Sequence, residues 1–215
     1  MNKKIIWLFA LLASLSFSSC ITLLDEIKLN DDKSGEVFIG LESQMLGSIL
    51  SMAKDQIPTD MMDNLNTFPT EAQKRISNIE GISSVNAMDQ ISSGRLGINF
   101  HFKNSKALNN AYYALMEMKK TWYLPKIIKI GKHKIKRKDI SPQLVKQIEK
   151  EYPDLKDSEL LKYLKWETVI KLSSNSKKIE TEQTKSKVGD KNIKIRYSLT
   201  EIIKDEKSTA FTIRF

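Results

Sequence analysis

The segment RLGINFHFK, residues 95–103, gives the clearest indication of the fold. Side chains alternate across a β-strand, so one face of this segment would carry only apolar groups, from Leu96, Ile98, Phe100 and Phe102. An apolar segment, Ile82–Ile91, precedes it, and Ser92-Ser93-Gly94 between the two has the composition of a tight turn. The region therefore predicts an antiparallel hairpin with one buried face.

Strand-like alternation recurs on both sides of this hairpin. Glu26–Asn30 and Glu36–Leu41 flank the turn sequence Asp31–Gly35, which predicts another hairpin, with Gly35 free to take the positive φ of its turn. Near the C-terminus the alternation predicts three more strands, at Trp166–Leu172, Ile193–Leu199 and Phe211–Phe215. The polar stretches between them are expected to be turns, at Ser173–Ser176 and Lys185–Asn192.

Helical spacing of apolar residues separates the strands. The predicted helices are Leu41–Ile57, a short helix opened by the Thr70–Gln73 capping box, one from Asn104 or Ser105 to Met116, one opened by Ser141-Pro142, and a short one from Asp157 to Leu164. Hairpins separated by helices, with a strand-rich end, indicate an α+β fold with a largely antiparallel sheet. Residues 20–215 have the size of one domain, and a boundary near Lys138 is the alternative.

The N-terminus is organised like an export signal. Asn2, Lys3 and Lys4 precede an apolar run of about a dozen residues, Ile5–Phe17, and Ser18-Ser19-Cys20 follows. This run is shorter than the roughly 20 residues that span a bilayer as a helix. We therefore expect residues 1–19 to be a signal peptide that is removed.

Ser18-Ser19-Cys20 resembles the lipobox of bacterial lipoproteins, with Phe17 where that family usually has Leu. The resemblance implies a type II signal peptide, in which the Cys20 sulfur receives a diacylglyceryl group and Cys20 becomes the new N-terminus. It also favours the outer over the inner membrane, because Ile21 follows the cysteine instead of Asp. The alternative is ordinary cleavage after Ser18, which would release a soluble exported protein. Cys20 is the only cysteine, so no intramolecular disulfide is expected.

Positive charge is concentrated in one part of the chain. The formal charge is +9, and the segment from Lys119 to Lys138 holds nine Lys or Arg residues and no Asp or Glu. Its centre is predicted to form a hairpin that turns near Gly131-Lys132. We predict that this hairpin is exposed and that its cations can contact an anionic surface through Lys126, Lys129, Lys132, Lys134, Lys136, Arg137 and Lys138.

The basic hairpin has three interpretations. The default is that its lysines keep a sheet edge soluble and unpaired. The second is adhesion to anionic lipid headgroups or envelope polymers, for which Trp122, Tyr123 and Leu124 would be suitable interfacial neighbours. The third is nucleic-acid binding. Export to the envelope argues against it, so no nucleic acid is predicted as a partner. The sequence names no protein partner.

Other candidate sites fail on spacing. Asn30, Asp32 and Ser34 imitate the start of an EF-hand loop, but its twelfth position would be Leu41 instead of Glu. His101 and His133 have no partner at metal-ligand spacing. The chain contains no phosphate loop, nucleophile elbow or dinucleotide fingerprint. We therefore predict no metal and no cofactor.

Taken together, these observations predict a lipid-anchored envelope protein that acts as a non-catalytic binding or structural module. Its order of elements also loosely resembles small envelope lipoproteins of uncharacterised function. The alternative is an envelope enzyme whose site is assembled from dispersed residues, which sequence patterns cannot reveal.

Overall fold

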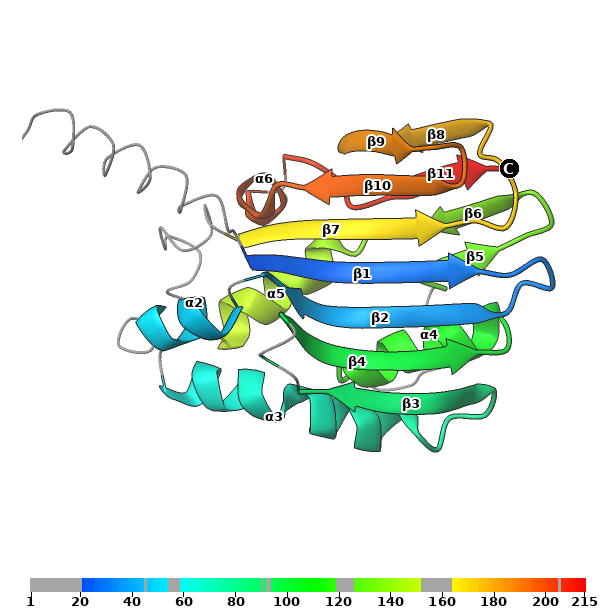
Figure 1. Ribbon diagram of the computed structural model, residues 1–215. Helices are drawn as coiled ribbons and strands as arrows, with labels where there is room; N and C mark the ends of the chain where they lie inside the picture. Colours follow the sequence, from blue (N-terminus) through cyan, green and yellow to red (C-terminus); the bar gives the residue numbers. More distant parts are fainter. Residues whose placement is uncertain are drawn as a thin grey trace, which may run out of the picture.

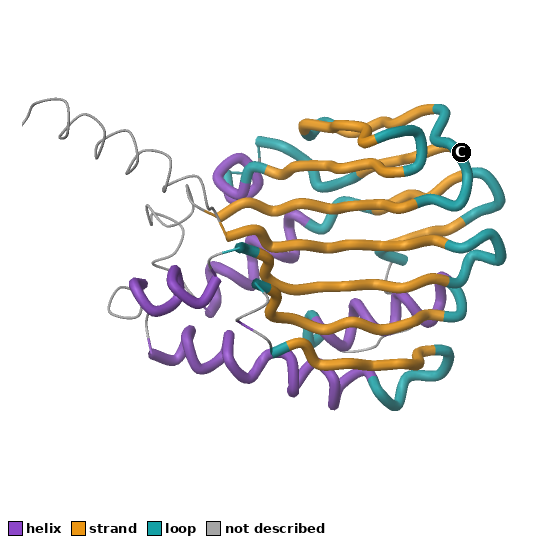
Figure 2. The backbone as a smooth tube through the Cα atoms, viewed as in Figure 1, coloured by secondary structure: helices purple, strands orange, loops and turns teal. Residues whose placement is uncertain are grey.

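The computed structural model describes residues 21–44, 46–53, 59–89, 91, 94–118, 126–151, 164–204 and 206–215. Its strands form two sheets, and its helices pack mainly on the same side of the larger sheet as the smaller one (Figure 1). The predicted α+β class is confirmed. Figure 2 shows how the strands, drawn in orange, extend side by side across the molecule.

The larger sheet has seven strands in the order β3-β4-β2-β1-β7-β10-β9. Its strands are β1 (Ile21–Leu29), β2 (Gly35–Glu42), β3 (Ile82–Met88), β4 (Arg95–Phe102), β7 (Leu164–Lys171), β9 (Thr184–Val188) and β10 (Asn192–Tyr197). Neighbours are antiparallel except β1 and β7, which run parallel with Ile21 beside Leu164. Strand β1 is therefore central, with three strands on either side.

The smaller sheet has four antiparallel strands in the order β5-β6-β11-β8. These are β5 (Ile128–Ile130), β6 (Lys134–Arg137), β8 (Lys178–Thr181) and β11 (Phe211–Arg214). It packs behind the β1-β7-β10 part of the larger sheet, and the chain passes from one sheet to the other between β8 and β9.

The helices are α2 (Leu46–Ala53), α3 (Thr59–Ile76), α4 (Ser105–Leu115), α5 (Ser141–Glu151) and α6 (Leu199–Ile203). Helix α3 packs on β3 and β4 and also contacts α4. Asn104 caps α4 as predicted, because its side-chain oxygen accepts hydrogen bonds from the backbone N–H groups of Lys106 and Ala107, both at 3.0 Å.

The main hydrophobic core lies between the layers, and a smaller cluster forms around Leu46 and Leu96. The four apolar side chains of RLGINFHF that sequence alternation places on one face are all buried, and Phe100 and Phe102 join Ile27, Val37 and Leu108 in the main cluster. The same cluster includes residues of the small sheet, among them Ile135 and Ile213. Burial of this apolar surface is what holds the two sheets face to face.

Several predicted boundaries were wrong. Leu41 belongs to β2 instead of opening a helix, and the predicted break before Thr70 is absent because α3 continues through Pro69. Leu164 starts β7 and Leu199 starts α6. Strands β8 and β9 were not predicted: all of β9 except its first residue, Thr184, falls in a stretch expected to be a turn. The predicted helix from Asp157 lies almost wholly outside the described residues.

The reason for the missed strand β9 is its exposure. All five of its residues are exposed, so no alternation of apolar and polar residues marks it. Gly35 was also misinterpreted. Lys33 takes the positive φ of that turn, at 69°, whereas a Cβ on Gly35 would lie 2.2 Å from the Lys28 carbonyl oxygen. Gly35 is needed for close contact between strands and not for a turn.

Candidate functional site

The basic segment forms the hairpin that its sequence predicts. Strands β5 and β6 are antiparallel, with Lys129 opposite Lys136. The hairpin is closed at its turn by a hydrogen bond from the Gly131 N–H to the Lys134 carbonyl, at 2.8 Å. Its open end is fixed by a 2.8 Å bond from the Lys138 N–H to the Ile127 carbonyl. Lys119, Lys120 and Trp122–Leu124 lie outside the described residues.

The two faces of this hairpin differ because strand side chains alternate. Ile128 and Ile135 are buried against the large sheet. Lys129, Lys134 and Lys136 are exposed on the opposite side. Lys126, Lys132 and Lys138, at the ends and the turn of the hairpin, are exposed as well. The backbone geometry therefore gathers the lysines on the outer surface of the small sheet.

The rest of the small sheet extends this surface with residues from distant parts of the chain. Lys134 lies opposite Arg214 of β11, which in turn lies opposite Lys178 of β8. Lys136 lies opposite Thr212, and Thr212 opposite Glu180. We call this surface the basic face and define it by the cations Lys129, Lys134, Lys136, Lys178 and Arg214.

Glu180 is the one carboxylate on the strands of this face. Its Oε1 lies 2.8 Å from Lys178 Nζ and 3.9 Å from Arg214 Nε. The hydrogen bond and positive charge of Lys178 lower the pKa of Glu180, and the charges of Arg214 and Lys136 add to the effect. The carboxylate is thus ionised at neutral pH, and five cations remain against one anion.

Arg137 is a correction to the predicted set of surface residues. Its side chain is 1% exposed and points into the space between the two sheets. The reason is register: Arg137 is two residues after the buried Ile135, so it shares the inward side of β6. The other six predicted cations are exposed, but Arg137 cannot touch an external anionic surface.

The guanidinium of Arg137 has a partner on every side. Its Nη1 donates to Asp25 Oδ2 and to Thr168 Oγ1, both at 3.0 Å, and its Nη2 donates to the Tyr197 hydroxyl. Nε and Nη2 each lie 3.3 Å from the Thr209 carbonyl oxygen. The Tyr112 hydroxyl donates to the other Asp25 oxygen at 2.7 Å. This cluster joins β6, β1, β7, β10 and α4.

Aromatic rings enclose the same cation. The guanidinium carbon lies 5.3 Å from the centre of the Trp166 ring, 5.0 Å from that of Tyr197 and 4.9 Å from that of Phe211. Burial raises the pKa of Asp25, while Arg137 and hydrogen bonds from Tyr112 and Thr168 oppose that rise. Because the guanidinium is bonded to side chains from both sheets, the arrangement fixes how the two sheets pack.

Asp139 follows the basic hairpin in the sequence, but its carboxylate accepts hydrogen bonds from Ser141 and Thr209 instead of pairing with the lysines. Its Oδ1 accepts hydrogen bonds from the Ser141 hydroxyl at 2.6 Å, the Thr209 hydroxyl at 2.8 Å and the Thr209 N–H at 2.9 Å. Burial alone would raise the pKa of Asp139, but the bonds from Ser141 and Thr209 outweigh it and lower the pKa to about 2. The carboxylate fastens the start of α5 and does not neutralise the lysines.

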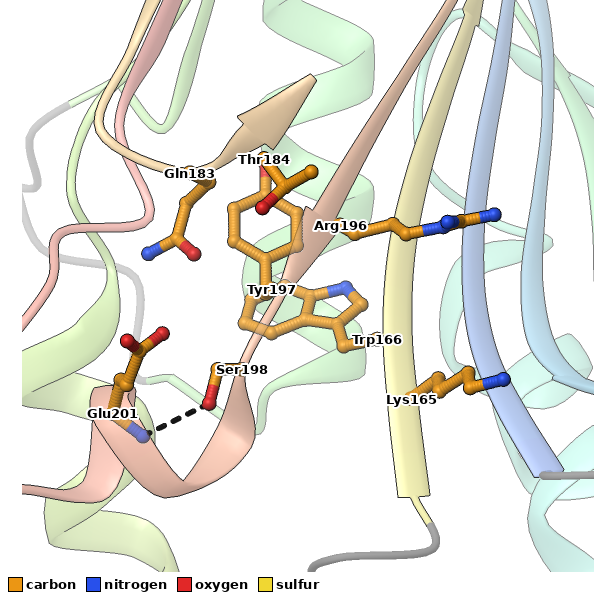
Figure 3. Close-up of a pocket in the computed structure, with 8 residues that line it drawn as sticks. All are labelled: Lys165, Trp166, Gln183, Thr184, Arg196, Tyr197, Ser198 and Glu201. Carbon is orange, nitrogen blue, oxygen red and sulfur yellow. Dashed lines mark hydrogen bonds between the residues drawn. The ribbon is translucent and has the colours of Figure 1, made fainter. Parts of the chain in front are cut away.

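A pocket of about 400 Å³ lies where β7 begins and β10 ends (Figure 3). The rings of Trp166 and Tyr197, 4.6 Å apart, lie side by side, and Gln183 and Glu201 extend into the space beside them. Lys165 and Arg196 also line the pocket but extend in the opposite direction.

Several polar groups of this pocket have partners within the chain. Glu201 pairs with Lys207 at 2.7 Å, and the Ser198 hydroxyl accepts a 3.3 Å hydrogen bond from the Glu201 N–H. Gln183 donates from Nε2 to the Ser208 carbonyl at 3.0 Å. None of the eight lining residues is a histidine or cysteine. The hydrogen bond of Lys207 lowers the pKa of the Glu201 carboxyl, and a hydrogen bond with the Ser198 side chain adds to the effect.

The remaining predicted positions give no metal centre. His101 is exposed, with Nε2 3.9 Å from Glu36 Oε1, and His133 lies in the exposed β5–β6 turn. In the Asn30–Ser34 turn, Asp32 accepts hydrogen bonds from the N–H and hydroxyl of Ser34. Across the described residues, no three His, Cys, Asp or Glu side chains are grouped to hold a metal ion. Cys20 lies outside the described residues.

Sequence reasoning missed Lys178 and Arg214. Arg214 alternates with the apolar Phe211–Phe215 pattern, so its outward side could have been predicted from the sequence. Lys178 could not, because β8 carries too little periodicity to be recognised as a strand. Only the strand pairing brings these two residues beside Lys134.

Comparisons with known proteins assign no functional property to this chain. No protein-family model matches the sequence, and no curated protein matches it significantly. Among solved structures, the chain is similar to the folded domain of LppM from Mycobacterium tuberculosis, determined by NMR, with a TM-score of 0.42 and 9% sequence identity. The similarity covers 92% of this chain and 91% of that one. At this TM-score and identity, no property of that domain is carried over.

The helices were also compared with the length and hydropathy needed to cross a membrane. None of those formed by the described residues is both long and apolar enough to do so.

Proposed function

We propose that this chain is a lipid-anchored protein of the cell envelope that binds an anionic partner through the basic face and performs no catalysis. The observation that carries the proposal is the composition of that face: five cations in cross-strand register and a single ionised carboxylate. Lys129, Lys134 and Lys136 are exposed, so their charges are available to an external anion.

The position of β1 supports the anchor. Cys20 would be joined directly to Ile21, the first residue of the central strand. Lipid on Cys20 would then hold one end of the large sheet at the bilayer, with almost no flexible tether. The outer membrane remains our expectation from Ile21.

The aromatic pocket is the specific observation that favours the alternative function, an envelope enzyme. A thermal-shift survey of envelope metabolites and lipids against the mature domain addresses it, because any ligand that binds only the folded state raises the midpoint. A small molecule that stabilises the domain and is converted during incubation would establish the enzyme instead of the binding module.

The anchor is tested by metabolic labelling with a clickable fatty acid. We expect the parent chain to become labelled and the Cys20→Ala variant to remain unlabelled, because the thioether-linked lipid requires the Cys20 sulfur. Equal labelling of the two chains would remove the lipoprotein proposal.

The basic face is tested by flotation of residues 20–215, carrying Cys20→Ser, with vesicles that contain anionic phosphatidylglycerol. At about 1 kcal/mol for each well-placed lysine, the variant Lys129→Gln/Lys134→Gln/Lys136→Gln should lose roughly a hundredfold in affinity. Binding of the parent should weaken as the Debye length falls from about 10 Å at 0.1 M salt to about 3 Å at 1 M.

A matched control removes three exposed lysines elsewhere, with Lys28→Gln/Lys74→Gln/Lys103→Gln. This control has the same net charge as the first variant but an intact basic face. If both variants lose the same affinity, the effect reflects total charge, and the basic face is merely a soluble sheet surface.

A further inference from the structure

The position of the basic face restricts what it can bind once the chain is anchored; this inference rests on the proposed function. Ile21 is paired with Leu164, and Thr22 is paired with both Lys165 and Glu42. The strand that follows Cys20 is therefore held in the sheet from its first residue. The lipid would lie within one residue of this rigid end.

The basic face lies in the other layer and extends away from that end. Arg137, at one end of β6, contacts Asp25, the fifth residue of β1. At the other end of β6, the His133 carbonyl accepts a hydrogen bond from the Phe215 N–H, near the C-terminal end of β1 (Figure 1). The lysines of β6 thus lie beside the half of β1 that is farther from Ile21.

For the basic face to contact the anchoring bilayer, its lysines and the lipidated Cys20 would both have to reach the bilayer surface. Packed sheets are about 10 Å apart, and the lysines extend outward beyond the small sheet. One residue spans at most about 3.6 Å, so Cys20 alone cannot cover this separation. About three residues of β1 would have to leave the sheet, breaking pairs on both sides, including those of Leu23 with Leu41 and Trp166.

The spacing of the cations indicates what can bind instead. Cross-strand neighbours such as Lys134 and Arg214 are about 5 Å apart at their Cα atoms. Alternate residues on one strand, such as Lys134 and Lys136, are about 7 Å apart. The face is therefore a flat grid of positive charges in two directions. A chain with a negative group every few ångströms can contact several of them at once, and multivalent contact raises affinity over that of a single anion.

We propose that the anchored protein uses the basic face to bind a linear polyanion in the aqueous space next to the membrane, and not the headgroups of its own bilayer. The large sheet stands with the Ile21 end at the bilayer. The basic face is then directed parallel to the membrane plane, into the aqueous space. A polymer can lie there across β5, β6, β11 and β8.

The experiment uses the lipidated chain in two kinds of vesicle, one of neutral phosphatidylcholine and one that also contains phosphatidylglycerol. The probe is long-chain sodium polyphosphate, with orthophosphate as the monomeric control. Lysines are acetylated at low salt and identified by mass spectrometry, with Lys28 on the opposite surface as internal reference.

We expect Lys129, Lys134 and Lys136 to be acetylated equally in both vesicles and to be protected by polyphosphate in both. Orthophosphate at the same phosphate concentration should protect them at least about a hundredfold less well. Lys28 should be unaffected by the polymer. The Lys129→Gln/Lys134→Gln/Lys136→Gln variant should bind polyphosphate more weakly than the Lys28→Gln/Lys74→Gln/Lys103→Gln control.

Protection of the three lysines by the anionic vesicle alone would overturn the inference, because it would place the face on the anchoring bilayer. Failure of polyphosphate to protect them, while the lipid-free domain still floats with anionic vesicles, would also overturn it and leave the proposed function intact. If the lipid-free domain binds neither vesicles nor polyphosphate, the proposed function itself fails.

Discussion

The outer surfaces of the two sheets carry charge in different ways. On the large sheet, acidic and basic residues pair across strands: Glu42 with Arg95 at 2.6 Å, Glu26 with Lys171 at 2.7 Å, and Glu167 with Lys194 at 2.7 Å. On the small sheet, the basic face carries five cations and one carboxylate, Glu180, which pairs with Lys178 and Arg214. On the first surface each of these cations has a carboxylate partner, whereas the second surface has one carboxylate for five cations.

This difference shows that a high content of lysine does not by itself create a binding surface. Lys171 and Lys194 are as cationic as Lys134 and Lys136, but each has a carboxylate within hydrogen-bonding distance. Pairing across strands contributes modestly to sheet stability and lowers the local potential. Strands β5 and β6 contain no acidic residue that could supply such pairing.

The largest expected effect concerns the inward side of the same strand. Arg137→Met removes the partner of the buried Asp25, so we expect a loss of about 3–5 kcal/mol in the free energy of unfolding. Lys136→Met, one residue away but outward, should change it by about 0.5 kcal/mol or less. Urea unfolding, followed by circular dichroism, measures both.

A second variant separates charge from packing. Arg137→Met combined with Asp25→Leu removes both buried charges and should recover much of the lost stability. Equal destabilisation by Arg137→Met and Lys136→Met would mean that the two sides of β6 do not differ as the structure indicates.

A smaller effect, on vesicle binding, is expected when a carboxylate is placed across from a lysine of the basic face, as on the large sheet. Thr212 lies between Lys136 and Glu180 in the register, so Thr212→Glu would place a carboxylate beside Lys136. Neutralising one cation should weaken flotation with anionic vesicles by about 1 kcal/mol, or roughly fivefold. Val188→Glu makes the same charge change on β9, where the side chain is 62% exposed. If Val188→Glu weakened vesicle binding as much as Thr212→Glu, the effect would come from total charge and not from neutralisation of Lys136.

The smallest effect concerns Asp139, a carboxylate close to the lysines but bonded inward. Its pKa falls from 3.8 to about 2 on folding. Its stabilisation is therefore complete above about pH 4 and is lost as the pH falls towards 2. Since the side chain is largely exposed, we expect Asp139→Asn to cost about 1 kcal/mol or less at neutral pH, well below what the full shift would give.

Urea unfolding at several pH values measures this effect. The parent and Asp139→Asn should differ in stability at neutral pH and converge as the pH falls below about 2, where Asp139 becomes protonated in both states of the parent. Flotation with anionic vesicles should be the same for both. A constant difference at every pH would assign the loss to packing instead of to the ionised carboxylate.

Much of the fold could be read from periodicity. The antiparallel pairs β3–β4 and β5–β6, the Asn104 cap and the helix opened by Ser141-Pro142 are local features, and local features are encoded by adjacent residues. Strands β8 and β9 could not be recognised, because edge strands with exposed, polar residues need no apolar alternation.

The sequence by itself determined the α+β class, the basic hairpin and the outward direction of most of its lysines, because alternation along a strand is a local property. It also supplied the expectation of a lipid on Cys20. Only the tertiary structure decided that Arg137 faces Asp25, and that Lys178 and Arg214 join the lysines of β6. These contacts join residues separated by tens of positions in the chain. They depend on which strands pair and which sheets pack together, and no short-range pattern records that choice.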